Sequence, residues 1–349
     1  MSIDLLRRLC ETPGIPGREE RVRALIEQEA AGLFDEIRTD AMGSLICTRK
    51  ATRGEGGPRV LLCCHMDEIG FYVSHIDEKG FIWVNAAGGF DTRNLFSRRV
   101  LVCTDDGDHR GVMNPGGKPV HISSPEDRKK VPDVDEFFVD LGMEPEEVRA
   151  KVHVGDFVVM DEPFLEQPKK LVSKALDNRV ACYLGLESVR KLAAEPGGHA
   201  CEIVVAFTTQ EEVGLRGAIT AAYSVEADYG IGIDVTLACD TPGVPEHQRV
   251  TKHGEGAGVK VQDSSLIADH RLVADLCGLA ESKGIPHQRC ILPRGGQDGA
   301  AIQRSRAGVR TAAVVVGTRY IHTVTEQIDR GDLQAAVDLL AAWLGTVDA

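Results

Sequence analysis

The chain has 349 residues, of which 43% are hydrophobic, so it is long enough to form one large domain or two modest ones around a sizeable core. Its 53 acidic residues outnumber its 40 basic residues, which gives a formal charge of -13, and Lys and Arg form no sustained run. Because phosphate binding needs a basic patch, this composition excludes a nucleic-acid surface and favours peptides, small molecules or further copies of the chain as partners.

The cysteines and the start of the chain predict a cytoplasmic protein. The ten cysteines are scattered singly apart from Cys63 and Cys64, without Cys-x-x-Cys spacing, which favours reduced and buried thiols. The N-terminus carries charged residues where a signal peptide needs an unbroken apolar stretch, and no run of about 18 apolar residues follows. We therefore expect no membrane association.

In chain order, the sequence predicts amphipathic helices followed by buried strands that alternate with helices. Apolar residues at helical spacing between 18 and 34 predict a helix, and the unbroken apolar run over 60–64 predicts a buried strand. Further along, the pattern predicts a helix over 178–194, strands over 202–207 and 230–233, a helix over 265–282, a strand over 311–316 and a closing helix from about 332. This alternation is typical of an α/β fold, with a mixed sheet covered by helices on both faces.

Residues 68–167 have a different texture. Short β-like pieces over 81–84, 99–102 and 157–159 are separated by Gly, Asp and Pro. We expect an inserted, small, β-barrel-like domain over 68–167, while residues 1–67 and 168–349 form the two parts of the α/β domain.

His65 ends the first buried strand, and Asp67 follows two residues later. A lone histidine here is more simply satisfied by a turn. An aspartate at this spacing, however, can accept one ring N–H and leave the other nitrogen free to bind a metal ion.

Asp177 lies where the helix over 178–194 begins. An aspartate at a helix start is most often a capping residue. A carboxylate has two oxygens, so at the strand edge it could also bridge two cations.

Two adjacent acids, Glu211 and Glu212, follow the strand over 202–207, at the carboxyl edge where open α/β sheets collect their ligands. Side chains of neighbouring residues diverge, so one carboxylate could bind a cation while the other accepts a proton from water. By themselves the pair could equally be two solvated loop residues.

Asp234 closes the strand over 230–233, and His322 follows the last predicted strand by a few residues. Each is unremarkable alone, since acids and histidines are common in turns. Together with His65, Asp177, Glu211 and Glu212, they would form a costly cluster of like charge unless cations compensate it.

The charge of the cluster indicates two metal ions. If Asp177, Glu212 and Asp234 are ligands, they contribute about -3 against about +4 from two divalent cations, and a bridging hydroxide neutralises the remainder. A single cation would leave the site anionic. Imidazole and carboxylate donors without a thiolate suit Zn²⁺ first, with Co²⁺ or Mn²⁺ as alternatives, and differ from a structural zinc site.

Five segments together resemble the TET-type dimetal aminopeptidases, a family of glutamyl and deblocking aminopeptidases that form large tetrahedral particles. They are HMDEIGF, ALDNR, QEEVGLRGA, IGIDVT and RYIHT, in the family's order and spacing over nearly the whole chain. The resemblance implies a zinc-exopeptidase-like fold and hydrolysis of the N-terminal residue of peptides by water activated between two metal ions.

The resemblance also implies a role for each site residue. Glu211 would be the general base, and Asp67 would be the partner of His65. The implied metal ligands are His65, Asp177 and Asp234 for one ion, and Asp177, Glu212 and His322 for the other.

The inserted domain of this family dimerises, and its dimers build a hollow dodecamer. The matching segment here is KPVHISSPEDRKKVPDVDEFFVD, in which His121 would approach a neighbouring subunit's site. The chain departs from the family at Thr323 and Val324, where Ser-Pro is common, and at Gln297, where threonine is usual, and these residues are expected to border the substrate pocket. Asp298 is interpreted as a helix N-cap.

Four alternatives compete with this reading. An N-acyl amino-acid or dipeptide hydrolase of the same clan would use the same metal chemistry and differ only in substrate. A glycoside hydrolase needs two carboxylates but no histidines. A non-catalytic scaffold would have lost a metal ligand, and no ligand is missing here. A nucleotide-binding protein would need a phosphate-binding loop, but the segment GVMNPGGKP lacks the spacing and the hydroxyl of such a loop.

Overall fold

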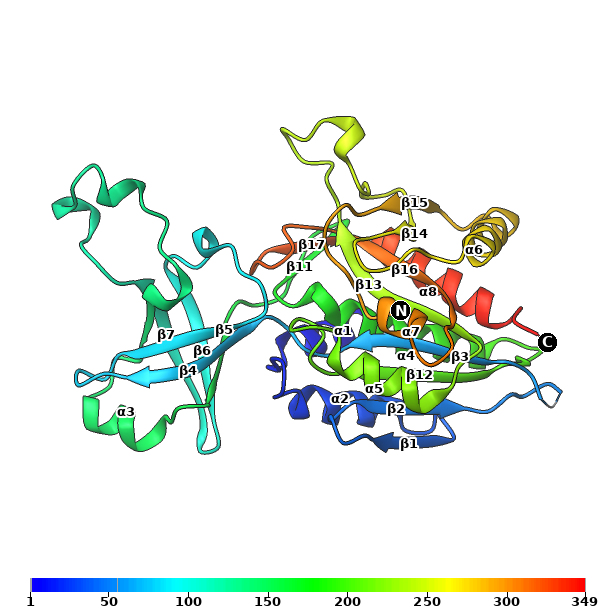
Figure 1. Ribbon diagram of the computed structural model, residues 1–349, viewed down its shortest axis with the longest axis horizontal. Helices are drawn as coiled ribbons and strands as arrows, with labels where there is room; N and C mark the ends of the chain where they lie inside the picture. Colours follow the sequence, from blue (N-terminus) through cyan, green and yellow to red (C-terminus); the bar gives the residue numbers. More distant parts are fainter. Residues whose placement is uncertain (1, 55, 349) are drawn as a thin grey trace.

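The larger of two structural units is built on one mixed sheet (Figure 1). The computed structural model describes residues 2–54 and 56–348, and within them the sheet has 11 strands. The main path, in spatial order, is β1 (Glu36–Thr39), β2 (Leu45–Arg49), β12 (Glu202–Thr208), β3 (Arg59–His65), β13 (Tyr229–Leu237), β16 (Arg310–Arg319), β17 (Glu326–Asp329), β11 (Lys170–Ser173) and β10 (Leu165–Glu166), while β14 (Ala257–Gln262) joins β16 and carries β15 (His287–Ile291).

Helices cover both faces of this sheet, as the sequence predicts. The helices of the larger unit are α1 (Ile3–Glu11), α2 (Glu20–Ala30), α4 (Leu176–Ala194), α5 (Arg216–Val225), α6 (His270–Lys283), α7 (Gly299–Gln303) and α8 (Arg330–Leu344). Apolar residues of α1, α2, α4, α6 and α8 share one core cluster, and those of α5 and α7 lie in a second cluster on the other side. None of the described helices is long and apolar enough to cross a bilayer.

The unbroken apolar run in β3 follows from this two-sided cover. Val60, Leu62 and Cys64 enter the larger cluster, whereas Leu61 and Cys63 enter the cluster under α5 and α7. Successive side chains of a strand point to opposite faces, so a strand buried on both faces needs apolar residues at every position.

The second unit is a closed barrel, drawn to the left of the sheet in Figure 1. All its strands lie between Gly70 and Met160, within the segment expected to be inserted. In order around the barrel they are β4 (Gly70–Ile76), β5 (Ile82–Ala87), β8 (Phe137–Asp140), β7 (Gly107–Pro115), β6 (Arg98–Thr104) and β9 (Phe157–Met160), and α3 (Pro145–Lys151) packs Val148 into its core. A closed sheet leaves no unpaired edge strand.

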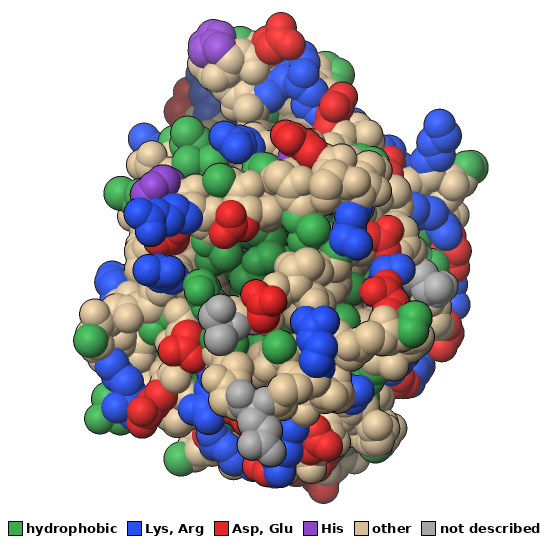
Figure 2. All heavy atoms as spheres, turned by 90° about the vertical axis from the view of Figure 1, so that its right-hand side faces the viewer, with side chains coloured by type: hydrophobic (Ala, Val, Ile, Leu, Met, Phe, Trp, Pro, Cys, Tyr) green, Lys and Arg blue, Asp and Glu red, His purple; other side chains and the backbone are tan. Residues whose placement is uncertain are grey.

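Charges of both signs are interspersed on the end of the molecule away from the barrel. Figure 2 shows this face, with acidic and basic side chains scattered around a central apolar area rather than gathered by sign.

Several element boundaries differ from those predicted. The helix predicted from 265 begins at His270, where Asp269 accepts hydrogen bonds from the backbone N–H groups of Arg271 and Leu272. The strand predicted to end before Asp234 continues to Leu237. Residues 326–329 form one further strand, β17, after the last one predicted, because they pair with both β11 and β16.

Candidate metal centre

Three parallel strands bring the first site residues to one edge of the sheet. His65 ends β3 and is paired with Thr208, the last residue of β12. Pairing between β3 and β13 runs to Gly232 opposite Cys63, and two residues further along Asp234 lies level with His65 while still inside its own strand. The carboxyl ends of parallel strands meet at the same edge, which explains why residues distant in sequence converge here.

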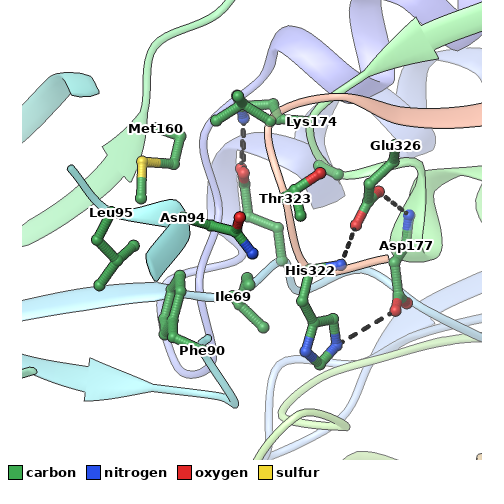
Figure 3. Close-up of a pocket in the computed structure, with 13 residues that line it drawn as sticks. Ile69, Phe90, Asn94, Leu95, Met160, Lys174, Asp177, His322, Thr323 and Glu326 are labelled. Carbon is green, nitrogen blue, oxygen red and sulfur yellow. Dashed lines mark hydrogen bonds and ion pairs between the residues drawn. The ribbon is translucent and has the colours of Figure 1, made fainter. Parts of the chain in front are cut away.

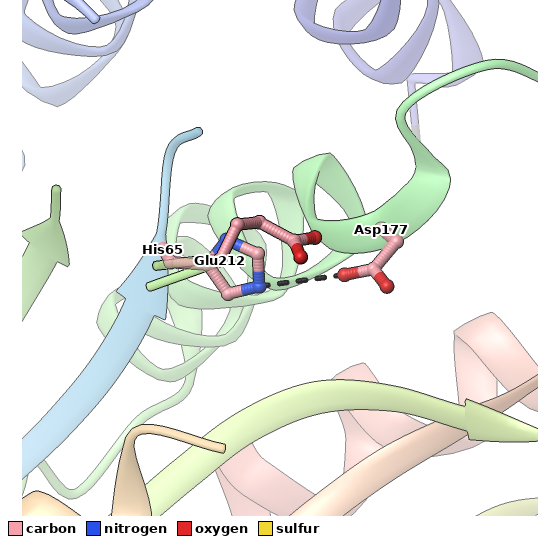
Figure 4. A group of neighbouring side chains, drawn as sticks. All are labelled: His65, Asp177 and Glu212. Carbon is pink, nitrogen blue, oxygen red and sulfur yellow. Dashed lines mark ion pairs between the residues drawn. The ribbon is translucent and has the colours of Figure 1, made fainter. Parts of the chain in front are cut away.

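His65 is oriented by the backbone of Asp67. The Nδ1 atom of His65 lies 3.1 Å from the carbonyl oxygen of Asp67 and 3.5 Å from its carboxylate. The carbonyl oxygen can only accept, so Nδ1 carries the proton and Nε2 is free to act as a ligand. That Nε2 lies 3.3 Å from Asp177 Oδ1 (Figure 4). It also lies 3.9 Å from Glu211 Oε2 and 4.0 Å from Asp234 Oδ1.

Asp177 lies between the two histidines. While its Oδ1 faces His65, its Oδ2 is 3.4 Å from His322 Nε2, which is also 3.4 Å from Glu212 Oε1. Asp177 does not cap α4, because Asn178 Oδ1 accepts the backbone N–H of Ala181 instead. A bridging position for Asp177 is thus available, as the two oxygens of one carboxylate face two separate imidazoles.

The buried carboxylates of Asp67 and Glu19 bind the backbone at residues 210–212, which include the adjacent acids Glu211 and Glu212. Asp67 accepts the N–H of Glu211 at 3.0 Å and the N–H of Glu212 at 3.1 Å, and Glu19 accepts the N–H of Gln210 at 3.0 Å. These contacts fix three successive peptide groups, so the two adjacent side chains diverge as predicted. Glu211 turns toward His65, and Glu212 turns toward His322.

Glu326 is a site residue that the sequence reasoning missed. It is 2% exposed, and its carboxylate accepts the backbone N–H groups of Asp177 and His322. The only signal in the sequence was an acidic residue at the start of a strand, four residues after His322. Such a residue is indistinguishable from a solvated turn former until the pairing of β17 is known.

Burial and mutual repulsion act on the carboxyl groups of the site. Burial raises the pKa of Glu211 well above its ordinary value, and the charge of Asp234 adds to this effect. Burial and the charge of Asp177 raise the pKa of Asp234 to about 8, and they also raise that of Glu212. Burial is the larger cause of each shift, and repulsion between neighbouring carboxylates adds to it.

The histidines supply the positive charge in direct contact with these carboxylates. Burial opposes protonation of His322, yet hydrogen bonds to Asp177 and Glu212 raise its pKa to about 12. Among the described residues, no Lys or Arg lies within 4 Å of the carboxylates of Asp177, Glu212 or Asp234. A protein that buries such a cluster without basic partners fits divalent cations, which would replace the histidine protons.

The donor atoms are close enough for metal binding. One group is His65, Asp177 and Glu212, and the other is His65, Glu211 and Asp234, each with its donor atoms within 4.8 Å of one another. Neutral imidazole nitrogens with carboxylate oxygens and no thiolate suit Zn²⁺, Co²⁺ or Mn²⁺.

Two hollows adjoin the site on either side of His322. The larger has about 910 Å³ of empty space, including space open to solvent. It is lined by the carboxylates of Glu211, Glu212 and Asp234 and by the apolar side chains of Leu237 and Ile321. The smaller lies against the barrel and is lined by apolar residues (Figure 3), namely Ile69, Phe90, Leu95, Met160 and Val324.

The other residues singled out in the sequence lie as follows. Asp298 does not cap α7 with its side chain; the side chain is buried and accepts the hydroxyl of Thr208. Gln297 is fully buried and accepts the N–H of Gly299, so it does not line the larger cleft. His121 is exposed on the loop between β7 and β8. Thr323 and Val324 do line the smaller pocket.

Comparison with known proteins gives a consistent result. The family model described as M42 glutamyl aminopeptidase matches residues 43–339. The lysyl aminopeptidase of Pyrococcus furiosus is 30% identical to this chain, covering 98% of it and 96% of the relative.

Two solved structures are similar over their whole lengths. The TET aminopeptidase of the marine sediment archaeon Thaumarchaeota archaeon SCGC AB-539-E09 is 32% identical, with a TM-score of 0.94 over 99% of this chain and 96% of that chain. The TET1 peptidase of Pyrococcus horikoshii, which can assemble into a tetrahedron or a large octahedral shell, is 31% identical, with a TM-score of 0.87 over 99% of both chains.

Proposed function

The chain belongs to the family of M42 glutamyl aminopeptidases, which are metal-dependent peptidases, and we propose that it cleaves the N-terminal residue of peptides with Glu211 as its general base. The observation that carries this proposal is the position of Asp177. Its two oxygens lie 3.3 Å from His65 Nε2 and 3.4 Å from His322 Nε2, which is the arrangement that a carboxylate shared by two cations requires.

The five ligands divide into two groups that share Asp177. His65 and Asp234 complete one group, and Glu212 and His322 complete the other, in agreement with the distances between their donor atoms. Zn²⁺ is the metal we propose first, and Co²⁺ or Mn²⁺ would be accepted by the same donors.

Cations held by these residues would lower the pKa of a water molecule and polarise the peptide carbonyl group. We assign the proton of that water to Glu211, whose carboxylate lies 3.9 Å from His65 Nε2 and is left free by the two sets of ligands proposed above. Burial raises its pKa, and a carboxylate with a raised pKa accepts a proton more readily at neutral pH. Glu211 then returns the proton to the leaving amine.

The larger cleft supports a peptide as substrate. It is open to solvent on one side and brings Glu211 and Asp234 next to the apolar side chains of Val235, Leu237 and Ile321. A peptide can therefore lie with its first carbonyl group at the carboxylates and its side chain against the apolar wall.

We also propose that copies of the chain associate through the barrel domain, in the cytoplasm. The Pyrococcus horikoshii TET1 peptidase, which assembles into closed shells, has the same fold over 99% of this chain. The ten cysteines are all free thiols, as expected in a reducing compartment. Analytical ultracentrifugation would contradict the association if the protein sediments as a monomer at micromolar concentration.

The test separates the two adjacent acids. We expect Glu211→Gln to keep both equivalents of metal while kcat on aminoacyl anilides falls about 100- to 10,000-fold, because only the base is lost. Glu212→Gln, which changes a proposed ligand at the neighbouring position, should instead lose metal. A Glu211→Gln variant with full metal content and near-wild-type turnover would show that Glu211 is not the base.

A further inference from the structure

Glu326 connects the two segments that carry Asp177 and His322. It is the first residue of β17 and pairs with Ser173, the last residue of β11. Asp177 follows β11 by four residues, and His322 precedes β17 by four residues. The carboxylate of Glu326 therefore lies at the point where both segments leave the sheet.

Each oxygen of this carboxylate accepts one backbone N–H. Oε1 lies 2.7 Å from the nitrogen of His322, and Oε2 lies 2.9 Å from the nitrogen of Asp177 (Figure 3). The side chain is 2% exposed, so water cannot readily replace either contact. A backbone N–H that is buried at this depth without a partner is unfavourable, so neither contact is readily lost.

His322 depends on this contact because its backbone is in an unfavourable conformation. Its φ is 63°, in the left-handed region that residues other than glycine rarely adopt, and Tyr320 in the same segment has a φ of 60°. Left-handed conformations are unfavourable for residues with a side chain, so a segment with two of them needs specific contacts to hold its shape.

We infer that Glu326 is a positioning residue, which fixes the separation of the bridging carboxylate of Asp177 from the imidazole of His322. The inference rests on the proposed function, since it assigns Glu326 to the cation site without making it a ligand. A carboxylate is planar and rigid, so its two oxygens set the distance between the two peptide groups that they bind. That distance in turn sets the 3.4 Å separation of Asp177 Oδ2 and His322 Nε2.

The test is a metal titration of apoprotein with Co²⁺, followed by its visible absorption. For Glu326→Ala we expect one of two equivalents to bind about 10- to 100-fold more weakly, the usual effect of removing a group that orients a ligand. The matched control is Asp332→Ala. Asp332 is 1% exposed and accepts the backbone N–H groups of Gly254 and Gly256, none of which contacts the cation site.

Glu326→Gln provides a conservative second variant, which carries the test if Glu326→Ala does not fold. Its amide has one acceptor oxygen and one donor nitrogen, so it keeps one of the two contacts, and we expect an intermediate affinity. A merely structural role would lower the stability of Glu326→Ala and Asp332→Ala alike while leaving Co²⁺ affinity unchanged in both.

Two outcomes distinguish this inference from the proposed function. If wild-type protein binds two equivalents of Co²⁺ and both Glu326 variants bind them with wild-type affinity, Glu326 has no positioning role and the proposed function is unaffected. If wild-type protein binds no divalent cation, the proposed function itself is wrong, and the role of Glu326 is lost with it.

Discussion

At the scale of single residues, the buried acids around the site have two distinct uses. Asp177 and Glu212 face imidazoles, whereas Asp67 and Glu326 face backbone N–H groups. Residue type does not reveal which use applies. Backbone N–H donors stabilise the charge of Asp67 and Glu326 without a cation. Asp177 and Glu212 lie close to each other and to neutral or protonated imidazoles, where a bound cation would stabilise their charge.

His253, which lies outside this site, is expected to make the stability of the protein depend on pH. His253 is half-buried, its Nε2 lies 3.0 Å from the carbonyl oxygen of Gly317, and its buried Nδ1 has no partner among the described residues. Burial, assisted by the charges of Lys170 and Arg319 and opposed by Asp240, lowers its pKa to about 4. A proton on Nδ1 would therefore be buried without an acceptor.

We predict that His253 makes the protein less stable as the pH falls. Its folded pKa of about 4 lies below its ordinary value of 6.5, so the unfolded chain binds the extra proton and stability is lost between pH 6.5 and pH 4. His253→Gln should reduce this loss by about 1–2 kcal/mol, measured by urea unfolding at several pH values. The exposed His247→Gln is the control, and an equal effect of both variants would exclude His253 as the cause.

Only a comparison of variants isolates this effect. Asp332 has a pKa raised to about 6, mainly by burial, so its own contribution to stability increases as the pH falls from 6 to its ordinary value of 3.8. The two groups act in opposite directions over the same range, and the wild-type profile contains both.

At the scale of elements, the start of α5 supports the turn that carries the acidic pair. The N–H groups of Arg216 and Gly217 donate to the carbonyl oxygens of Gln210 and Thr209, so the helix folds back on the end of β12. A Cβ atom on Gly217 would lie 2.5 Å from the backbone nitrogen of Thr209 and 2.6 Å from its oxygen. Only glycine allows this close approach of helix and turn.

We predict that Gly217→Ala destabilises the protein by about 1–3 kcal/mol, because the backbone must move to admit the methyl group. Activity should fall as well, since the movement displaces the turn at 210–212. Gly278→Ala is the matched control, because it lies in α6 with open space around it and should stabilise the protein by about 0.5–1 kcal/mol. Equal unfolding free energies for the two variants, by urea titration, would contradict the close packing.

At the scale of the whole molecule, cations would link parts of the chain that are far apart in sequence. His65, Asp177, Asp234 and His322 follow or belong to four different strands, so a cation bound by these side chains would join the four strands in the folded state. Any ligand that binds only the folded state raises its stability by mass action.

We predict that a chelator lowers the melting temperature of the wild-type protein by about 5 °C or more. The same chelator should have little effect on Asp177→Asn, which lacks the shared carboxylate. Adding Zn²⁺, Co²⁺ or Mn²⁺ back separately, followed by calorimetry and anilide hydrolysis, would rank the metals. An unchanged melting temperature in the wild type would argue against tightly bound cations.

The order of the strands explains which expectations held and which did not. The buried run at 60–64 and the pairing of adjacent acids were visible because they depend on neighbouring residues. Asp298 occupies the predicted N-cap position of α7, but its side chain binds Thr208 instead of the helix, and that contact joins residues 90 positions apart. Glu326 was missed for the same reason, as its partner Asp177 lies 149 positions away.

Hydrophobic periodicity and short motifs are local properties of a chain, so the α/β class, the inserted β domain and the residue types of the candidate metal site could be predicted from the sequence. The tertiary structure was needed to show which acids face imidazoles and which face peptide groups. It placed Asp177 between two histidines and Glu326 behind them, through pairings of β11, β16 and β17 that no local pattern encodes. Distances across a sheet depend on strand order, and strand order is decided by how the whole chain packs.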